Sequence, residues 1–173
     1  LSPYLMKREA AILRKSIEKT APQTDLAAVL LEPAKISKGG LLGSQVSALL
    51  ELSKDERELH YHAVGHLAHA IARSPAPVVF SAPAAVCGTA VGLALHSQCL
   101  VVTELTRLSL PGAAHGAVPE SLASHHLARL PGHLGRYLVL TGAALTGAEL
   151  HALGLASHLT ESHALARLAD LIS

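Results

Sequence analysis

Apolar and polar positions follow two different periods along the chain, and these periods separate helices from strands. Apolar residues at helical spacing among Lys and Arg predict a surface helix over residues 2–19, which Pro22 ends. Short apolar runs flanked by Pro, Gly or polar residues predict buried strands at residues 26–31, 77–82, 99–103, 107–110 and 156–159. Residues 33–43, with two adjacent glycines, predict a loop.

Longer amphipathic segments supply the remaining helices. Residues 44–73 predict either one long helix or two, and further helices are predicted at residues 88–97, 120–130, 133–141, 146–153 and 162–172. Strands that alternate with helices indicate an α/β fold. A length of 173 residues without a linker or an internal repeat fits one domain over residues 1–173.

Residues 74–103 contain no Lys, Arg, Asp or Glu, so they imitate a membrane span in composition. Three prolines, two glycines and two polar side chains interrupt this stretch: Pro75, Pro77, Pro83, Gly88, Gly92, His96 and Gln98. Because such residues break a continuous apolar helix, the stretch predicts a buried strand, a turn and a buried helix rather than a span.

The amino-acid composition limits which residues can build the core and which kinds of partner the chain can attract. Half of the residues are hydrophobic but only 2% are aromatic, so Ala, Leu and Val must build the core. Charged residues make up 16%, below the roughly 25% of average domains, which suggests that another molecule covers part of the surface. A net charge of +1 gives no global attraction to nucleic acid. The two cysteines, Cys87 and Cys99, form neither a metal-binding pair nor a disulfide framework.

Several glycine- and proline-containing blocks carry a resemblance to a known family. They occupy residues 77–79, 86–95, 110–111, 116–120, 130–135, 140–142 and 152–156. Their residues and their spacing resemble the crotonase (enoyl-CoA hydratase/isomerase) family, and the pattern over residues 91–98 is most similar to the 3-hydroxyisobutyryl-CoA hydrolase branch. The resemblance implies a spiral of β-β-α units with two sheets and surrounding helices. The family's opening strand would precede Leu1, and its C-terminal helical region would follow Ser173.

The resemblance also implies the chemistry of the site. Two backbone N–H groups stabilise the oxyanion of a thioester, and a nearby carboxylate moves protons or activates water. The first donor position falls at Gly39 and the second at Thr89. Glu120 falls where the hydrolase branch has an Asp, so it is the candidate catalytic residue. The implied ligand, if the pocket is retained, is a CoA thioester, and no other cofactor is expected.

This sequence departs from the family pattern at several of the positions that matter. Leu41 stands where the family has an acidic residue after the paired glycines. The second donor position has a branched residue, Thr89, where the family has glycine. At the two positions where hydratases have a carboxylate, this chain has Gly92 and Gly112. The hydrolase branch also has glycine at the first of these positions. The glycines after the surviving carboxylate are replaced by Leu122 and Ala123. These departures predict a site that has lost its activity.

Three other features each have two interpretations. Glu120 can be a retained carboxylate, or the first-turn acid of a helix whose dipole favours it. His62, His66 and His69 share a helical face, either as metal ligands without a completing carboxylate or as a polar face in a chain with 12 histidines. Ser124 with His125 and His126 could indicate a nucleophile and base, but no G-x-S-x-G elbow surrounds them.

The first predicted helix is basic, with Lys7, Arg8, Arg14, Lys15 and Lys19. Glu9 and Glu18 lie among these cations, which favours a solvated face over a phosphate contact. On this helix alone the cations suffice for a peripheral contact with ribosomal RNA or an acidic protein, but are too few for independent nucleic-acid affinity.

Two functions follow from the resemblance. Relatives of the hydrolase branch occur in the small subunit of the mitochondrial ribosome, and crotonase-like chains occur as accessory subunits of respiratory complexes. The first hypothesis is therefore a catalytically degenerate, mitochondrial structural subunit with protein partners, in the ribosomal small subunit or, as second choice, in a respiratory-chain complex. The alternative is an acyl-CoA hydrolase or hydratase that uses Glu120, in a crotonase-like homo- or hetero-trimer.

Overall fold

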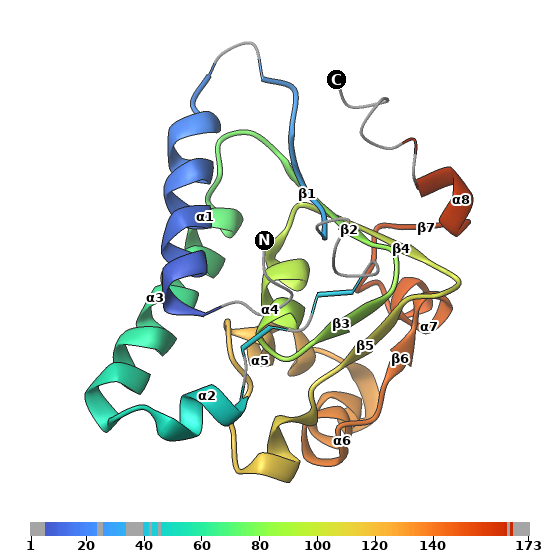
Figure 1. The fold of residues 1–173 in the computed structure, drawn as a ribbon. Helices are drawn as coiled ribbons and strands as arrows, with labels where there is room; N and C mark the ends of the chain where they lie inside the picture. The colour runs from blue at the N-terminus through green and yellow to red at the C-terminus, as the bar shows by residue number, and fades with distance from the viewer. Residues whose placement is uncertain are drawn as a thin grey trace.

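The computed structural model describes residues 6–23, 26–33, 40–41, 43–44, 46–165 and 167. Its central element is a four-stranded parallel sheet in the order β1-β2-β4-β7 (Figure 1). The strands are β1 (Val29–Leu31), β2 (Val78–Ala82), β4 (Cys99–Thr103) and β7 (His158–Thr160). β2 and β4 lie inside the sheet and are mostly buried, which explains why they appear in the sequence as continuous apolar runs.

A second sheet of three strands lies beside the first, in the order β3-β5-β6. β3 (Ala85–Cys87) pairs in parallel with β5 (Arg107–Ser109), which pairs antiparallel with β6 (Leu145–Thr146). The sequence did not predict β3 or β6. Both are too short to show a period of two, and β3 is contained in a run of small residues. The successive units β2-β3-α4 and β4-β5-helix produce the repeated β-β-α spiral that the resemblance implied.

The N-terminal helices form an outer layer. α1 (Lys7–Thr20) packs along α3 (Lys54–Ala72), and the short α2 (Val46–Glu51) precedes α3 (Figure 1). The segment 44–73 therefore forms two helices. The break lies at Ser53, which caps α3 through a reciprocal capping box with Glu56. The first predicted strand is shorter than expected, since only Val29–Leu31 pairs with β2.

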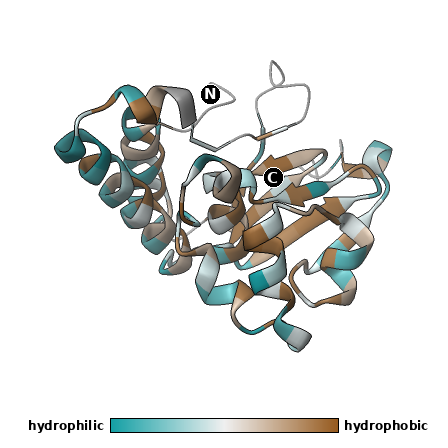
Figure 2. Cartoon of the chain, turned by 90° about the horizontal axis from the view of Figure 1, so that it is seen from below, coloured by the Kyte–Doolittle hydropathy of each residue, from teal (hydrophilic) through white to brown (hydrophobic). Residues whose placement is uncertain are grey.

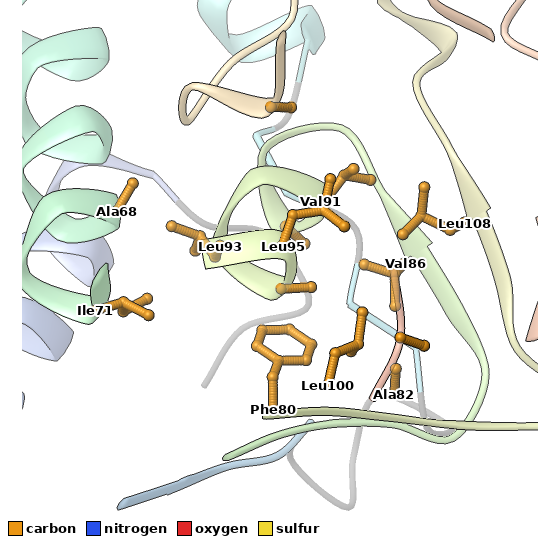
Figure 3. Packing of buried hydrophobic residues seen from close by; sticks show 14 of the residues in the cluster. Ala68, Ile71, Phe80, Ala82, Val86, Val91, Leu93, Leu95, Leu100 and Leu108 are labelled. Atoms are coloured by element: carbon orange, nitrogen blue, oxygen red, sulfur yellow. The ribbon is translucent and has the colours of Figure 1, made fainter. Parts of the chain in front are cut away.

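The core surrounds α4 (Thr89–His96), whose residues from Thr89 to Leu95 are all buried. Figure 3 shows Val91, Leu93 and Leu95 of α4 between α3 and the strands that carry Phe80 and Leu100. The uncharged stretch 74–103 is thus β2, β3, α4 and β4, as the prediction of strand, turn and buried helix required. The described residues include no helix that combines the length and the apolar character needed to cross a membrane. Hydrophilic residues are found mainly on the helices, whereas the strands are largely hydrophobic (Figure 2).

The C-terminal part is a series of short helices. They are the 3-10 helices η2 (Pro111–His115) and η3 (Pro131–His133) and the α-helices α5 (Ala123–Leu127), α6 (Leu134–Thr141), α7 (Gly147–Ala152) and α8 (Ser162–Leu165). The predicted helix over residues 120–130 is wrong in its extent. Ser121 and Leu122 adopt left-handed backbone angles (φ 52° and 57°), so the α-helix cannot begin before Ala123.

Candidate active-site pocket

A pocket opens at the start of α4, between η2 and the segment that leads to α5. Its polar end contains Ser44, Thr89 and Glu120. Its remaining wall is formed largely by small and apolar residues: Cys87, Gly88, Leu110, Pro111, Gly112, Ala113, Ala117, Val118, Pro119 and Val139. The strand-to-helix turn at Gly88 brings the N-terminus of α4 to this point, with a backbone conformation (φ 57°, ψ −127°) that suits only glycine.

Four polar side chains form a buried network at this end of the pocket. The Ser44 hydroxyl donates to Oε2 of Glu120 at 2.6 Å, and the Thr89 hydroxyl donates to the same oxygen. The Ser44 hydroxyl also contacts Oγ1 of Thr89, and the Ser44 backbone N–H donates to that atom at 3.1 Å. Nε2 of His60 lies 2.9 Å from the Ser44 hydroxyl and 3.9 Å from the Glu120 carboxylate.

The network determines which ring nitrogen of His60 carries the proton. The single proton of the Ser44 hydroxyl is directed to Glu120, so the hydroxyl oxygen must accept from His60. Nε2 is therefore the protonated nitrogen. Nδ1 of His60 is buried and finds no hydrogen-bond partner among the described residues. A fully buried imidazole thus donates to Ser44, and it is not part of the pocket lining.

Opposing effects act on the pKa of the Glu120 carboxyl group. Burial is the largest single effect and raises its pKa, whereas the nearby His60 and the hydrogen bonds from the Ser44 and Thr89 hydroxyls together lower the pKa below the usual value. Glu120 is therefore an anion at neutral pH. Two hydroxyls of the protein donate to Oε2, whereas Oε1 receives no hydrogen bond from the described residues.

The interpretation of Glu120 as a helix cap is wrong. Its carboxylate points into the network rather than along α5, and the first turn of α5 contains no acidic residue. The left-handed conformations of Ser121 and Leu122 turn the chain between Glu120 and the helix. Such conformations favour glycine, which is the residue that the family resemblance implied for position 122.

The structure brings together two of the three site residues that the sequence predicted. Thr89 and Glu120 are in contact, whereas Gly39 lies outside the described residues. Ser44 and His60 were missed. His60 has the spacing of the apolar stripe of α3, together with Val64, Leu67 and Ile71, and this register was the one available signal that it is buried.

Two glycines replace carboxylate positions, and they differ in the space around them. A Cβ on Gly92 would lie 2.8 Å from the Ser121 carbonyl carbon and closer still to its oxygen. No side chain fits there without moving the backbone. A Cβ on Gly112 would lie 3.3 Å from both the Cβ and the carbonyl oxygen of Ala117, so a Cβ there requires Ala117 to move by only a few tenths of an ångström.

The other histidines singled out in the sequence have neighbours of a different kind from those that the two interpretations required. His62 lies 3.6 Å from Glu58 and stacks edge-on against His66, and the described residues contain no group of three potential ligands that could hold a metal. His126 lies 3.1 Å from His96 rather than beside Ser124. Burial, reinforced by the neighbouring histidines, lowers the pKa of His126 to about 4, so it is neutral at neutral pH.

We expect Ser44→Ala to lower the free energy of unfolding by about 1–3 kcal/mol, because His60 and Glu120 would each lose a buried partner. Chemical denaturation monitored by circular dichroism measures this change. Ser121→Ala is the control, since the Ser121 hydroxyl is buried without a partner among the described residues and its removal should cost little. Equal stabilities of the two variants would contradict the network.

The parallel β-β-α spiral and a carboxylate at the start of a buried helix define a crotonase-type protein, and comparison with known proteins agrees. A family model described as enoyl-CoA hydratase/isomerase matches residues 6–173, and the chain belongs to this family. Among solved structures, a carnitinyl-CoA dehydratase from Mycobacterium thermoresistibile superposes with a TM-score of 0.88 at 25% identity, over 98% of this chain and 50% of that one. An enoyl-CoA hydratase from Bacillus anthracis superposes with a TM-score of 0.86 at 17% identity, over 98% of this chain and 66% of that one.

Curated relatives of this chain include proteins of two kinds. A probable 3-hydroxyisobutyryl-CoA hydrolase 2 from Arabidopsis thaliana is 35% identical over 85% of this chain and 39% of that protein. The small ribosomal subunit protein mS47 from Neurospora crassa is 30% identical over 90% of this chain and 34% of that protein. The chain thus spans less than half the length of either relative. A mouse relative, 33% identical over 71% of this chain and 33% of that protein, is a mitochondrial 3-hydroxyisobutyryl-CoA hydrolase, and the expected mitochondrial location is confirmed.

Proposed function

We propose that this protein is a catalytically inactive member of the crotonase family that serves as a structural subunit of the mitochondrial ribosome's small subunit. The observation that carries the proposal is the internal occupation of Glu120. Its carboxylate receives hydrogen bonds from Ser44 and Thr89 inside the protein, and the second carboxylate position is Gly112. A site with one carboxylate held by its own protein and the other missing supports a fold that is retained for its surfaces.

The relative from Neurospora crassa supports the choice of assembly, since it matches 90% of the chain and is a ribosomal protein by name. Partners of this chain would then be other subunits of that particle. The second choice, a respiratory-chain complex, has no comparable support among these relatives. The proposal therefore ranks the ribosomal particle first.

The alternative function is hydrolysis of an acyl-CoA thioester. The Arabidopsis and mouse relatives are 3-hydroxyisobutyryl-CoA hydrolases by name, and Glu120 does line the pocket at the start of α4. A CoA thioester would enter beside Gly88 and Gly112. For Glu120 to act on it, the carboxylate would have to exchange its bonds with Ser44 and Thr89 for bonds to the substrate or to water.

Sedimentation of native mitochondrial extract tests the proposal. The protein should migrate with the small ribosomal subunit in a sucrose gradient, and it should follow that subunit when removal of Mg²⁺ separates the ribosome. A respiratory-complex marker run in the same gradient identifies the second choice. Migration mainly at the size of a free monomer or trimer would overturn the structural proposal and favour the enzyme.

A further inference from the structure

Three histidines gather where α5 packs against the end of α4. His96 is the last residue of α4, and His125 and His126 belong to α5. Nε2 of His126 lies 3.1 Å from Nδ1 of His96, and the two rings meet edge-on with their centroids 4.6 Å apart. The ring of His125 stacks on that of His96 at a centroid distance of 6.2 Å. Imidazole rings therefore link the two helices.

The contact between His96 and His126 is a hydrogen bond that requires one N–H group and one bare nitrogen. A neutral imidazole has one of each, so two neutral rings can form the bond. An additional proton cannot lie between the two nitrogens as well. It either takes the acceptor position and breaks the bond, or it binds to the far nitrogen of one ring, which for His96 is the buried Nε2 without a partner among the described residues. Both routes add a positive charge to rings that are partly buried.

No acidic side chain of α4, α5 or α6 can offset such a charge. Residues 121–148 contain no Asp or Glu. Their cations are Arg129, which follows α5, and Arg136 of α6, which lines a groove beside α5. Glu120 is the nearest acid in the sequence, but it bonds to Thr89 at the first residue of α4. The end of α4 lies about 10 Å further along the helix axis.

The other elements that contact α4 are α3 and β3, and they bring no acid to its end. The Gln98 side chain, which follows α4, donates to the backbone carbonyl of Ile71 in the last turn of α3. The charged or titratable residues at this end of α3 are His69 and Arg73, whereas the acids of α3 all lie in its first two turns. β3 carries no charged side chain, and its Cys87 lies at the beginning of α4. Within these described elements, a protonated imidazole pair therefore has only cations and other imidazoles as titrating neighbours.

The pKa values of the two rings agree with these surroundings. Burial, together with the charges of His96, His125 and Arg129, lowers the pKa of His126 to about 4. Burial and the neighbouring His125 also lower the pKa of His96. Both rings are therefore neutral at neutral pH, and the hydrogen bond between them is intact there.

We propose that His96 and His126 form an acid-sensitive joint, which holds α5 on α4 while both rings are neutral and releases α5 when they take up protons. In the released segment each ring returns toward the ordinary pKa of 6.5, so release binds protons. The joint is therefore fully effective above about pH 6.5 and weakens as the pH falls toward about 4, where the held form is protonated as well. Release uncovers Ala123 and Leu127, which are buried in the core. The inference does not rest on the proposed function.

Hydrogen exchange followed by mass spectrometry from about pH 7 to about pH 5 tests the joint in the full chain. After correction for the chemical exchange rate at each pH, the opening equilibrium of residues 121–130 should rise about tenfold. The lowered pKa of His126 alone would allow a larger rise, but its ring is partly exposed and solvent screens the charge. Residues 7–20 (α1), which contain no histidine, should change by less than about twofold. Glu120 stays largely ionised in this range, because its pKa lies below the ordinary 4.5.

A pair of double variants separates the joint from a general sensitivity to acid. His96→Gln with His126→Gln leaves two amides that can bond to each other and removes both titrating rings. Exchange of residues 121–130 should then change by less than about twofold over the same pH range. The control is His115→Gln with His163→Gln, which alters two exposed histidines outside α4 and α5 and should keep the response of about tenfold.

Three results would contradict the joint. The first is the absence of an acid response in residues 121–130 of the unmodified chain, or an equal response in residues 7–20, and this measurement decides even if the glutamine pair fails to fold. The second is an acid response that survives in the glutamine pair. The third is a control variant that loses the response as the glutamine pair does.

Discussion

The purified chain is expected to hydrolyse or hydrate short acyl-CoA thioesters no faster than buffer does. Removal of a general acid or base costs about 10²–10⁴ in rate. Gly112 supplies no carboxylate, and the carboxylate of Glu120 is bound by Ser44 and Thr89. Both groups that would transfer protons are thus absent or engaged.

The assay uses 3-hydroxyisobutyryl-CoA and crotonyl-CoA, with thiol release and loss of the enoyl absorbance as the two measurements. Glu120→Gln is the matched variant, because it keeps the shape of the side chain and removes its charge. Turnover by the unmodified chain that Glu120→Gln abolishes would contradict the expectation, and it would establish the hydrolase alternative.

Returning Thr89 and Gly112 to the residues of the family pattern should not restore thioester hydrolysis or hydration unless the chain still binds CoA. Thr89→Gly with Gly112→Glu opens the polar end of the pocket and adds a carboxylate where only a small shift of Ala117 is required. Leu41 and Leu122 still depart from the family pattern, so the loops around the thioester differ. Calorimetry with CoA on the unmodified chain tests the premise, and micromolar binding would show that the pocket is intact.

Gly92→Ala is expected to destabilise the fold by about 3 kcal/mol or more, because the new Cβ would overlap the Ser121 carbonyl group. The segment before α5 would have to move, and Glu120 would move with it. Thermal and urea denaturation measure the change, and an insoluble or unfolded variant is an acceptable result in the expected direction.

Gly65→Ala provides the matched control for Gly92→Ala. Both glycines lie inside helices, but a Cβ on Gly65 meets nothing within 4 Å. Alanine should therefore stabilise α3 by about 0.5–1 kcal/mol through its higher helix propensity. If the two variants changed stability in the same direction and by the same amount, close approach of Ser121 to α4 would not be the cause.

Only part of the candidate site could be predicted from the sequence. Thr89 and Glu120 were predicted because the family resemblance assigns positions one by one, and the structure brings them into contact. Ser44 and His60 were not, although they complete the same network. They are separated from Glu120 by 76 and 60 positions in the chain, and nothing in a linear pattern of 12 histidines distinguishes the one that is buried.

The α/β class, the strands of the central sheet and the buried nature of residues 74–103 followed from the sequence, because apolar periodicity and breaker residues act over a few neighbouring positions. The tertiary structure alone decided three things. The left-handed turn at Ser121 and Leu122 shortened α5 and directed Glu120 inward. The approach of Ser44 and Thr89 placed two hydroxyl donors on Oε2 of Glu120. The packing of α1 on α3 built an outer helical layer from segments that are more than 30 positions apart in the chain. Each depends on contacts between segments distant in the chain, where packing and buried hydrogen bonds outweigh local preference.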